Sequence, residues 1–159
     1  MTTAEDGRVD QVTRTLEASP EAIYGAFRDG DVLMQWLPPS GMSGKVLEYD
    51  FRVGGRYRFE LRYERDGGHG KTDSNTDVSK GEFLQLVPGE TIQQSVEFES
   101  DDPELARVMT MTWTFARRGD ATEVTVRADH VPSSIGRDDH LAGIAASLEN
   151  LSRHVLRGA

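Results

Sequence analysis

The chain of 159 residues has a formal net charge of -9 at pH 7 and contains no cysteine. This length predicts one domain with a single hydrophobic core, and the absence of cysteine excludes disulfide bonds and thiolate chemistry, which fits a reducing compartment. The negative charge repels nucleic acid and anionic membranes, so we expect neither as a partner.

Residues 1–10 are polar and form an expected flexible N-terminal tail, so the predicted single domain spans 11–159. The start of the chain has no apolar run that would suit a signal peptide, and no later segment is apolar enough to insert into a membrane. We therefore expect a cytoplasmic protein, either a monomer or a homodimer.

A first strand is expected at 12–18, where apolar and polar residues alternate imperfectly. A short helix should follow, because Ser19 is a good N-cap and Pro20 suits the first helical position. A second short helical segment should end before Pro38 and Pro39, since proline cannot continue a helix. The sequence thus predicts two short helices after the first strand.

Residues 44–130 carry the pattern of about six strands separated by turns. The clearest strand, 56–64, alternates charged residues with apolar ones that would share one face: Tyr57, Phe59, Leu61 and Tyr63. Alternation of this kind, with short turns between strands, is typical of an antiparallel sheet with one face in water. The Gly-, Asp- and Ser-containing segment 65–77 is expected to be a mobile loop.

The closing segment, from about 133 to 156, has apolar residues at three- and four-residue steps and predicts a helix roughly 35 Å long. The middle of this helix is thin, because it contains Gly143 and the small residues Ala142, Ala145 and Ala146. Two interpretations stay open: the missing volume leaves a cavity, or it permits close contact between helix and sheet.

The order of these elements resembles the helix-grip fold of the START-like or birch-pollen-allergen-like superfamily (SRPBCC). More narrowly, it is similar to the family named after the activator of the heat-shock chaperone ATPase. The motifs that carry the resemblance are ASPEAIYGAF, QWLPP, VGGRYRFELR, GEFLQLVPGETI and AGIAASLENL. The resemblance implies an α+β fold, in which a curved antiparallel sheet of about seven strands wraps around the long C-terminal helix. It also implies a ligand cavity between sheet and helix, and it marks Ile144 as a departure, since the family usually has Trp after the helix glycine.

Motifs for metal, cofactor or nucleophile chemistry are not evident. The segment GGHGKT lacks the spacing and the strand-to-helix context of a phosphate loop, and the four histidines lack ligand spacing. The stretch DDH at 138–140 is explained by acids at a helix start, although a cation could bind there adventitiously. We therefore expect no cofactor, no metal site and no assigned catalytic residue.

Polar residues on otherwise apolar strand faces are the remaining signal. Gln94 shares a face with Ile92 and Val96, and His130 continues the face of Val126. A buried amide or imidazole needs a partner, a water or a ligand, although a satisfied side chain near a strand end is an equally simple explanation. The candidate cavity residues are Trp36, Tyr57, Phe59, Tyr63, Gln94, Met111, Trp113, His130, Ile144 and Leu148, and core packing alone also accounts for the aromatic ones.

The function that this sequence favours is binding of a small hydrophobic molecule, an apolar or aromatic metabolite or a lipid-like compound. One alternative is a co-chaperone-like interaction module whose acidic surface contacts a chaperone. Another is an enzyme similar to the polyketide cyclases and aromatases, with His130, Tyr57 and Gln94 as acid–base candidates.

Overall fold

The computed structural model describes all residues except 1–7, 40, 65–75 and 159. The described elements, in chain order, are β1 (Val9–Leu16), α2 (Pro20–Gly25), α3 (Gly30–Trp36), β2 (Met42–Tyr49), β3 (Arg56–Tyr63), β4 (Thr76–Val87), β5 (Thr91–Phe98), β6 (Met109–Arg118), β7 (Ala121–Asp129) and α4 (Arg137–Gly158). The strands form one sheet in the order β1-β7-β6-β5-β4-β3-β2, with every neighbouring pair antiparallel.

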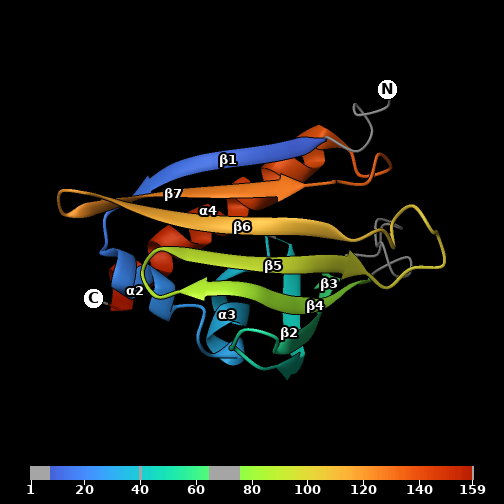
Figure 1. Ribbon diagram of the computed structural model, residues 1–159, viewed down its shortest axis with the longest axis horizontal. Helices are drawn as coiled ribbons and strands as arrows, with labels where there is room; N and C mark the ends of the chain where they lie inside the picture. Colours follow the sequence, from blue (N-terminus) through green and yellow to red (C-terminus); the bar gives the residue numbers. More distant parts are fainter. Residues whose placement is uncertain (1–7, 40, 65–75, 159) are drawn as a thin grey trace.

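The sheet bends around the long C-terminal helix. Figure 1 shows β1, β7 and β6 in front of α4, while β3 and β2 turn behind the plane of β4 and β5. The short helices α2 and α3 lie together at one end of this arrangement. The predicted α+β helix-grip fold, with a seven-stranded antiparallel sheet and two short helices after the first strand, is confirmed.

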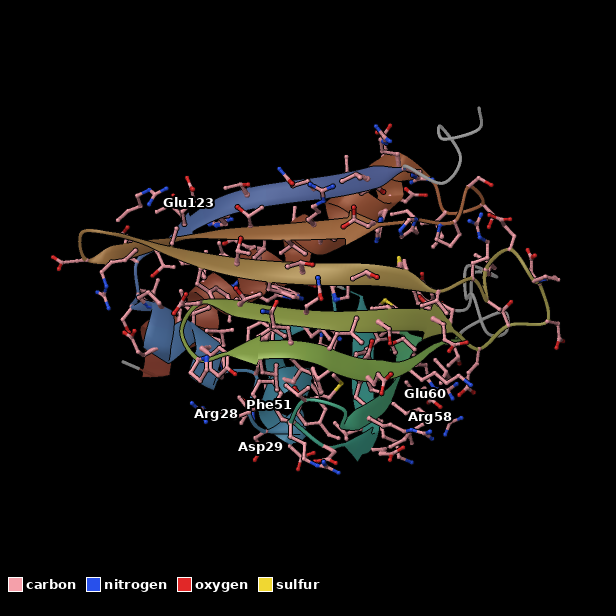
Figure 2. The ribbon with its side chains drawn as sticks, in the orientation of Figure 1. Arg28, Asp29, Phe51, Arg58, Glu60 and Glu123 are labelled. Atoms are coloured by element: carbon pink, nitrogen blue, oxygen red, sulfur yellow. The ribbon has the colours of Figure 1, made fainter. Side chains whose placement is uncertain are left out.

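The outer face of the sheet is polar, as the alternation in the sequence predicts. Figure 2 shows Arg58 and Glu60 projecting away from the sheet, and the Arg58 guanidinium donates to Glu99 at 2.5 and 2.8 Å. The intervening residues of β3, Tyr57 and Phe59, are buried on the other face. The period of two therefore separates water from core along the strand.

Local sequence signals explain where the helices begin. The Ser19 hydroxyl accepts a hydrogen bond from the Ala22 amide at 3.1 Å, and Pro20 is the first residue of α2, as expected. Helix α4 begins at Arg137, four residues later than the sequence predicts. The reason is that the Ser133 amide and hydroxyl donate to the Glu104 carboxylate, at 3.0 and 3.1 Å, which holds this residue in a loop.

Two strands begin earlier than expected. Strand β1 starts at Val9, so residues 9 and 10 belong to the sheet and not to the predicted tail, and Asp10 is buried. Strand β4 starts at Thr76, so Thr76 and Asp77 are buried strand residues and not part of the predicted mobile loop. The rest of that predicted loop, 65–75, lies outside the described residues.

The core is filled at the end of the molecule where α2 and α3 lie. The Phe27 ring packs edge-on against Trp36 and Trp113, with ring centres 5.0 Å apart in both pairs. The C-terminal half of α4 closes this end with Leu148 and Leu151, both fully buried. Within the described residues, no helix is long and apolar enough to cross a membrane.

Candidate ligand cavity

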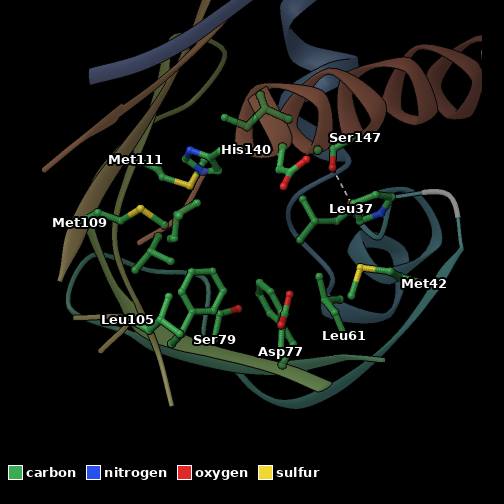
Figure 3. A pocket seen from close by; sticks show the side chains of 18 of the residues that line it. Leu37, Met42, Leu61, Asp77, Ser79, Leu105, Met109, Met111, His140 and Ser147 are labelled. Carbon is green, nitrogen blue, oxygen red and sulfur yellow. Dashed lines mark hydrogen bonds between the residues drawn. The ribbon is translucent and has the colours of Figure 1, made fainter. Parts of the chain in front are cut away.

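The other half of the interior is hollow. A cavity of about 730 Å³ lies between the concave face of the sheet and the N-terminal half of α4, as Figure 3 shows. Cavities of a few hundred to about 1,000 Å³ accommodate small organic molecules. The site therefore has the size that a bound metabolite requires.

The strands contribute mainly apolar and aromatic side chains to the cavity. Because these residues share the inward parity of β3, β5 and β6, their side chains point to one space. Seven of the ten sequence-predicted candidates line it, of which six lie on strands: Tyr57, Phe59, Tyr63, Gln94, Met111 and Trp113. Their placement agrees with the alternation in the sequence, and their role in binding stays a prediction.

Two of these candidates form a fixed polar pair in the cavity wall. The Tyr57 hydroxyl donates to the Ser95 carbonyl at 2.5 Å and accepts a hydrogen bond from the Gln94 side chain. Burial raises the pKa of Tyr57, which the hydrogen bond from Gln94 only partly offsets. Tyr57 is therefore a neutral, oriented phenol and is not poised to transfer a proton near neutral pH.

Helix α4 leaves space for the cavity where its side chains are small. A Cβ added at Gly143 would meet no atom within 4 Å, and Gly143, Ile144 and Ser147 all line the cavity. The interpretation of the thin helix as one side of a cavity therefore holds at Gly143, in place of close contact between helix and sheet. The expectation was wrong for the alanines: Ala142 and Ala145 are exposed, Ala146 is half-buried, and none of the three lines the cavity.

Three predicted candidates do not line the cavity. Trp36 is fully buried in the filled half, where its indole N–H donates to the Ala26 carbonyl at 3.1 Å. Leu148 faces the same half, one turn beyond Ile144. His130 follows the last residue of β7 with a positive φ of 61°, which ends the strand alternation, and its side chain is exposed.

The polar residues that do enter the cavity were missed, except for Gln94 and the tyrosines. Asp77 and Ser79 alternate along β4, and their parity would have identified them had the strand start been recognised. On α4, His140, Ile144 and Ser147 follow the i, i+4, i+7 spacing of one helix face. Asp139 and Ser134 complete the polar part of the lining.

A buried carboxylate orients His140. Asp10, whose side chain is fully buried, lies 2.7 Å from the His140 Nδ1 atom and accepts hydrogen bonds from Arg8 at 2.9 and 3.2 Å. Burial disfavours the charge of Asp10, but the hydrogen bonds and charges of Arg8 and His140 outweigh it, so the pKa of Asp10 is lowered. Arg8 also donates to the Ile135 carbonyl at 2.6 Å, which ties β1 to the loop that borders the cavity.

This cluster predicts a specific loss of stability in acid. Replacement Asp10→Asn should lower the free energy of unfolding by about 3 kcal/mol at neutral pH, because it leaves buried cationic partners uncompensated. In the wild type, a depressed carboxyl pKa contributes stability above the unfolded value of 3.8 that is lost as the pH falls through the lower folded value. Urea unfolding at about pH 7 and about pH 3 should therefore show the difference between wild type and variant shrinking in acid.

The control is Asp101→Asn, at an exposed residue of the loop after β5. Its difference from the wild type should stay small at both pH values. An Asp10→Asn deficit that is equally large at both pH values would show that the carboxylate charge is not what stabilises the cluster.

Metal binding finds no support among the described residues, which hold no group of three metal-ligating side chains. Within the stretch 138–140, Asp139 and His140 line the cavity, whereas Asp138 is exposed outside it. The imidazole is engaged with Asp10 on its Nδ1 side.

Comparison with known proteins identifies the relatives of this fold. The family described as "Activator of Hsp90 ATPase homolog 1-like protein" matches residues 17–155. The chain belongs to this family. The match begins directly after β1 and covers both short helices, strands β2 to β7 and most of α4, which confirms the resemblance seen in the motifs.

Solved structures of similar proteins agree with the family assignment. A protein from Chromobacterium violaceum is 33% identical, with 92% of this chain and 96% of that chain covered and a TM-score of 0.82. The AHSA1 protein from Silicibacter pomeroyi is 16% identical, with 96% and 100% covered and a TM-score of 0.77. DynU16, from the dynemicin biosynthetic locus, is 18% identical, with 94% and 48% covered and a TM-score of 0.68. The last two show the fold alone, and no curated protein matches.

Proposed function

We propose that this member of the Activator of Hsp90 ATPase homolog 1-like family binds a small apolar or aromatic molecule in the cavity. The observation that carries the proposal is a cavity of about 730 Å³ lined mainly by apolar and aromatic side chains. A filled core is the normal state of a protein interior, so an opening of this size is a departure that binding would explain. The helix-grip fold is consistent with this role.

The three acid–base candidates of the enzyme alternative are not arranged for catalysis in the cavity. His130 is exposed away from the cavity, and the Tyr57 hydroxyl and the Gln94 side chain are hydrogen-bonded to each other. The one imidazole that lines the cavity among the described residues is His140, oriented by Asp10. A cyclase-like activity would therefore depend on His140.

The co-chaperone-like alternative would need no bound ligand. The cytoplasmic location stays a prediction from the sequence.

Native mass spectrometry of the freshly purified protein is the first test of the proposal. We expect a retained small molecule, or failing retention, saturable binding of the neutral apolar dye Nile red at one site per chain. A protein that is folded by circular dichroism, carries no adduct and binds no dye would contradict the proposal and leave the protein-interaction alternative ahead.

Filling the cavity should displace the dye. Ile144 is 8% exposed and lines the cavity beside Gly143, so Ile144→Trp places an indole in empty volume. We expect the free energy of unfolding to stay within about 1 kcal/mol of the wild type, whereas overpacking a filled core costs ~1–3 kcal/mol. Dye affinity should fall severalfold, measured by fluorescence titration.

The matched control is Leu156→Trp, which adds the same indole to an exposed position of α4. Its dye affinity should equal that of the wild type. Strong destabilisation by Ile144→Trp, or equal dye binding by the two variants, would show that the space beside residue 144 is not the binding site.

A further inference from the structure

The segment between β5 and β6 forms part of the cavity wall at the end where α4 begins. Residues 100–107 of this segment leave the sheet, and Figure 1 shows them at the same end of the molecule as the loop that precedes α4. Leu105 from the segment lines the cavity, as Figure 3 shows, and so do Ser134, Ile135 and Gly136 from the loop. Two pieces of chain that are distant in the sequence therefore border the same space.

A single carboxylate joins these two pieces. The Glu104 Oε2 atom accepts hydrogen bonds from the Ser133 amide at 3.0 Å and from the Ser133 hydroxyl at 3.1 Å. Arg107, in the same segment as Glu104, lies 3.3 Å from this oxygen. Within the described residues, no other hydrogen bond or ion pair connects 100–107 to another part of the chain. We call this contact between Glu104 and Ser133 the latch.

The two pieces differ in how firmly they are held. The loop before α4 is fixed to the first strand, because Arg8 donates to the carbonyls of Pro132 and Ile135 at 3.1 and 2.6 Å. Residues 100–107 are held, apart from the latch, by hydrogen bonds within the segment and by the packing of one apolar side chain. If the latch opens, the segment 100–107 is therefore the part that moves.

The chemistry of the latch suits a contact that opens and closes. Hydrogen bonds to a charged group are stronger than neutral ones, and the hydrogen bond from the Ser133 amide lowers the pKa of Glu104, so the carboxylate stays charged near neutral pH. Ser133 is exposed, however, and the Glu104 side chain is 34% exposed, so water can replace these hydrogen bonds. The latch therefore holds the segment in place at a modest free-energy cost of opening.

We propose that residues 100–107 are a lid of the cavity, closed by the latch between Glu104 and Ser133 and opened to admit and release the ligand. This inference rests on the proposed binding function and concerns how the ligand enters. Leu105 is the part of the lid that lines the cavity, so a closed lid covers the ligand with an apolar side chain. Loop motions of this kind control access to many binding sites.

Weakening the latch should change the rates of binding and not the affinity. A lid that is closed in both the free and the bound protein slows association and dissociation by the same factor, so opening it more often raises both rates together. We expect Glu104→Ala to raise both rate constants for Nile red about fivefold in stopped-flow fluorescence, because it removes two hydrogen bonds to a charged group. The equilibrium affinity should stay within about twofold of the wild type.

Asp101→Ala is the matched control. It removes one negative charge from an exposed residue of the same segment that takes no part in the latch, so both of its rates should equal those of the wild type. Ser133→Ala removes the hydroxyl and keeps the amide, so it should raise both rates, but less than Glu104→Ala does. This order of effects ties the rates to the latch and not to the net charge.

Closing the lid covalently tests the inference in the opposite direction. Because the chain contains no cysteine, the double variant Glu104→Cys and Ser133→Cys can be joined by a short bismaleimide without competing thiols. The linked protein should take up Nile red at least about tenfold more slowly than the same variant before linking. The unlinked variant is the control, so a loss of stability from the substitutions themselves does not enter the comparison.

The outcomes separate the lid from the function on which it rests. If Nile red binds but neither Glu104→Ala nor the cross-link changes its rates, the ligand enters elsewhere and 100–107 is not a lid. If Glu104→Ala raises only the dissociation rate and weakens the affinity, the segment is a fixed part of the wall, which also overturns the inference. If the dye does not bind the wild type at all, the proposed function itself fails.

Discussion

Replacement Leu148→Asp is expected to unfold the protein. Leu148 is fully buried where α4 closes the filled half of the core, so the carboxylate would have neither water nor a cationic partner. The lost packing and the buried charge together should cost at least about 4 kcal/mol, close to the whole stability of an ordinary domain. Circular dichroism and thermal unfolding should show no cooperative transition.

The matched control is Leu156→Asp, eight positions later on the same helix. Leu156 is 51% exposed, so the same chemical change there should alter the free energy of unfolding by less than about 1 kcal/mol. A cooperative transition for Leu148→Asp near the temperature of the control would show that the C-terminal half of α4 does not close the core.

Replacement Gly81→Ala should have the next largest effect. A Cβ at this position would lie 1.9 Å from the backbone oxygen of Ser95, so β4 and β5 would have to separate. Two hydrogen bonds hold Ser95 in place and resist this separation. Its carbonyl accepts a hydrogen bond from the Tyr57 hydroxyl, and its hydroxyl accepts one from the Glu82 amide at 3.0 Å. We expect a loss of at least about 2 kcal/mol in urea unfolding, together with weaker Nile red binding as the cavity wall shifts.

The control for this prediction is Gly143→Ala, where an added Cβ meets no atom within 4 Å. Alanine in the interior of a helix should stabilise the protein by about 0.5–1 kcal/mol relative to glycine. A neutral result for Gly81→Ala would mean that the two strands tolerate a wider separation beside Tyr57 than their hydrogen bonds indicate.

The fold was predictable because its signals are local and periodic. Alternation along β3 placed Tyr57, Phe59 and Tyr63 on one face, and capping by Ser19 placed the start of α2. These patterns depend only on the period of a strand and on the orphan amides of a helix end. The same periodicity identified six cavity residues without any knowledge of the cavity.

The polar part of the site was not predictable in this way. Asp10 and Asp77 are charged residues near the ends of strands, and charged residues there normally mark solvent-exposed turns. Their burial depends on distant neighbours: Arg8 and His140 for Asp10, and the pairing of β4 with β3 for Asp77. The prediction for His130 was wrong in the opposite sense. Its position in the sequence implied an inward-facing side chain, but a positive φ directly after β7 turns it out of that face.

The sequence by itself determined the family, the order of elements and the inward face of most strands, because those properties follow from composition, capping and periodicity within short segments. Only the tertiary structure decided that the interior is filled beside Trp36 and Leu148 and hollow beside Gly143 and Ile144. The physical reason is that a cavity is a difference between the volume that the bent sheet encloses and the volume that side chains fill. The curvature that sets the first volume arises from all seven strands together and is not encoded at any one position.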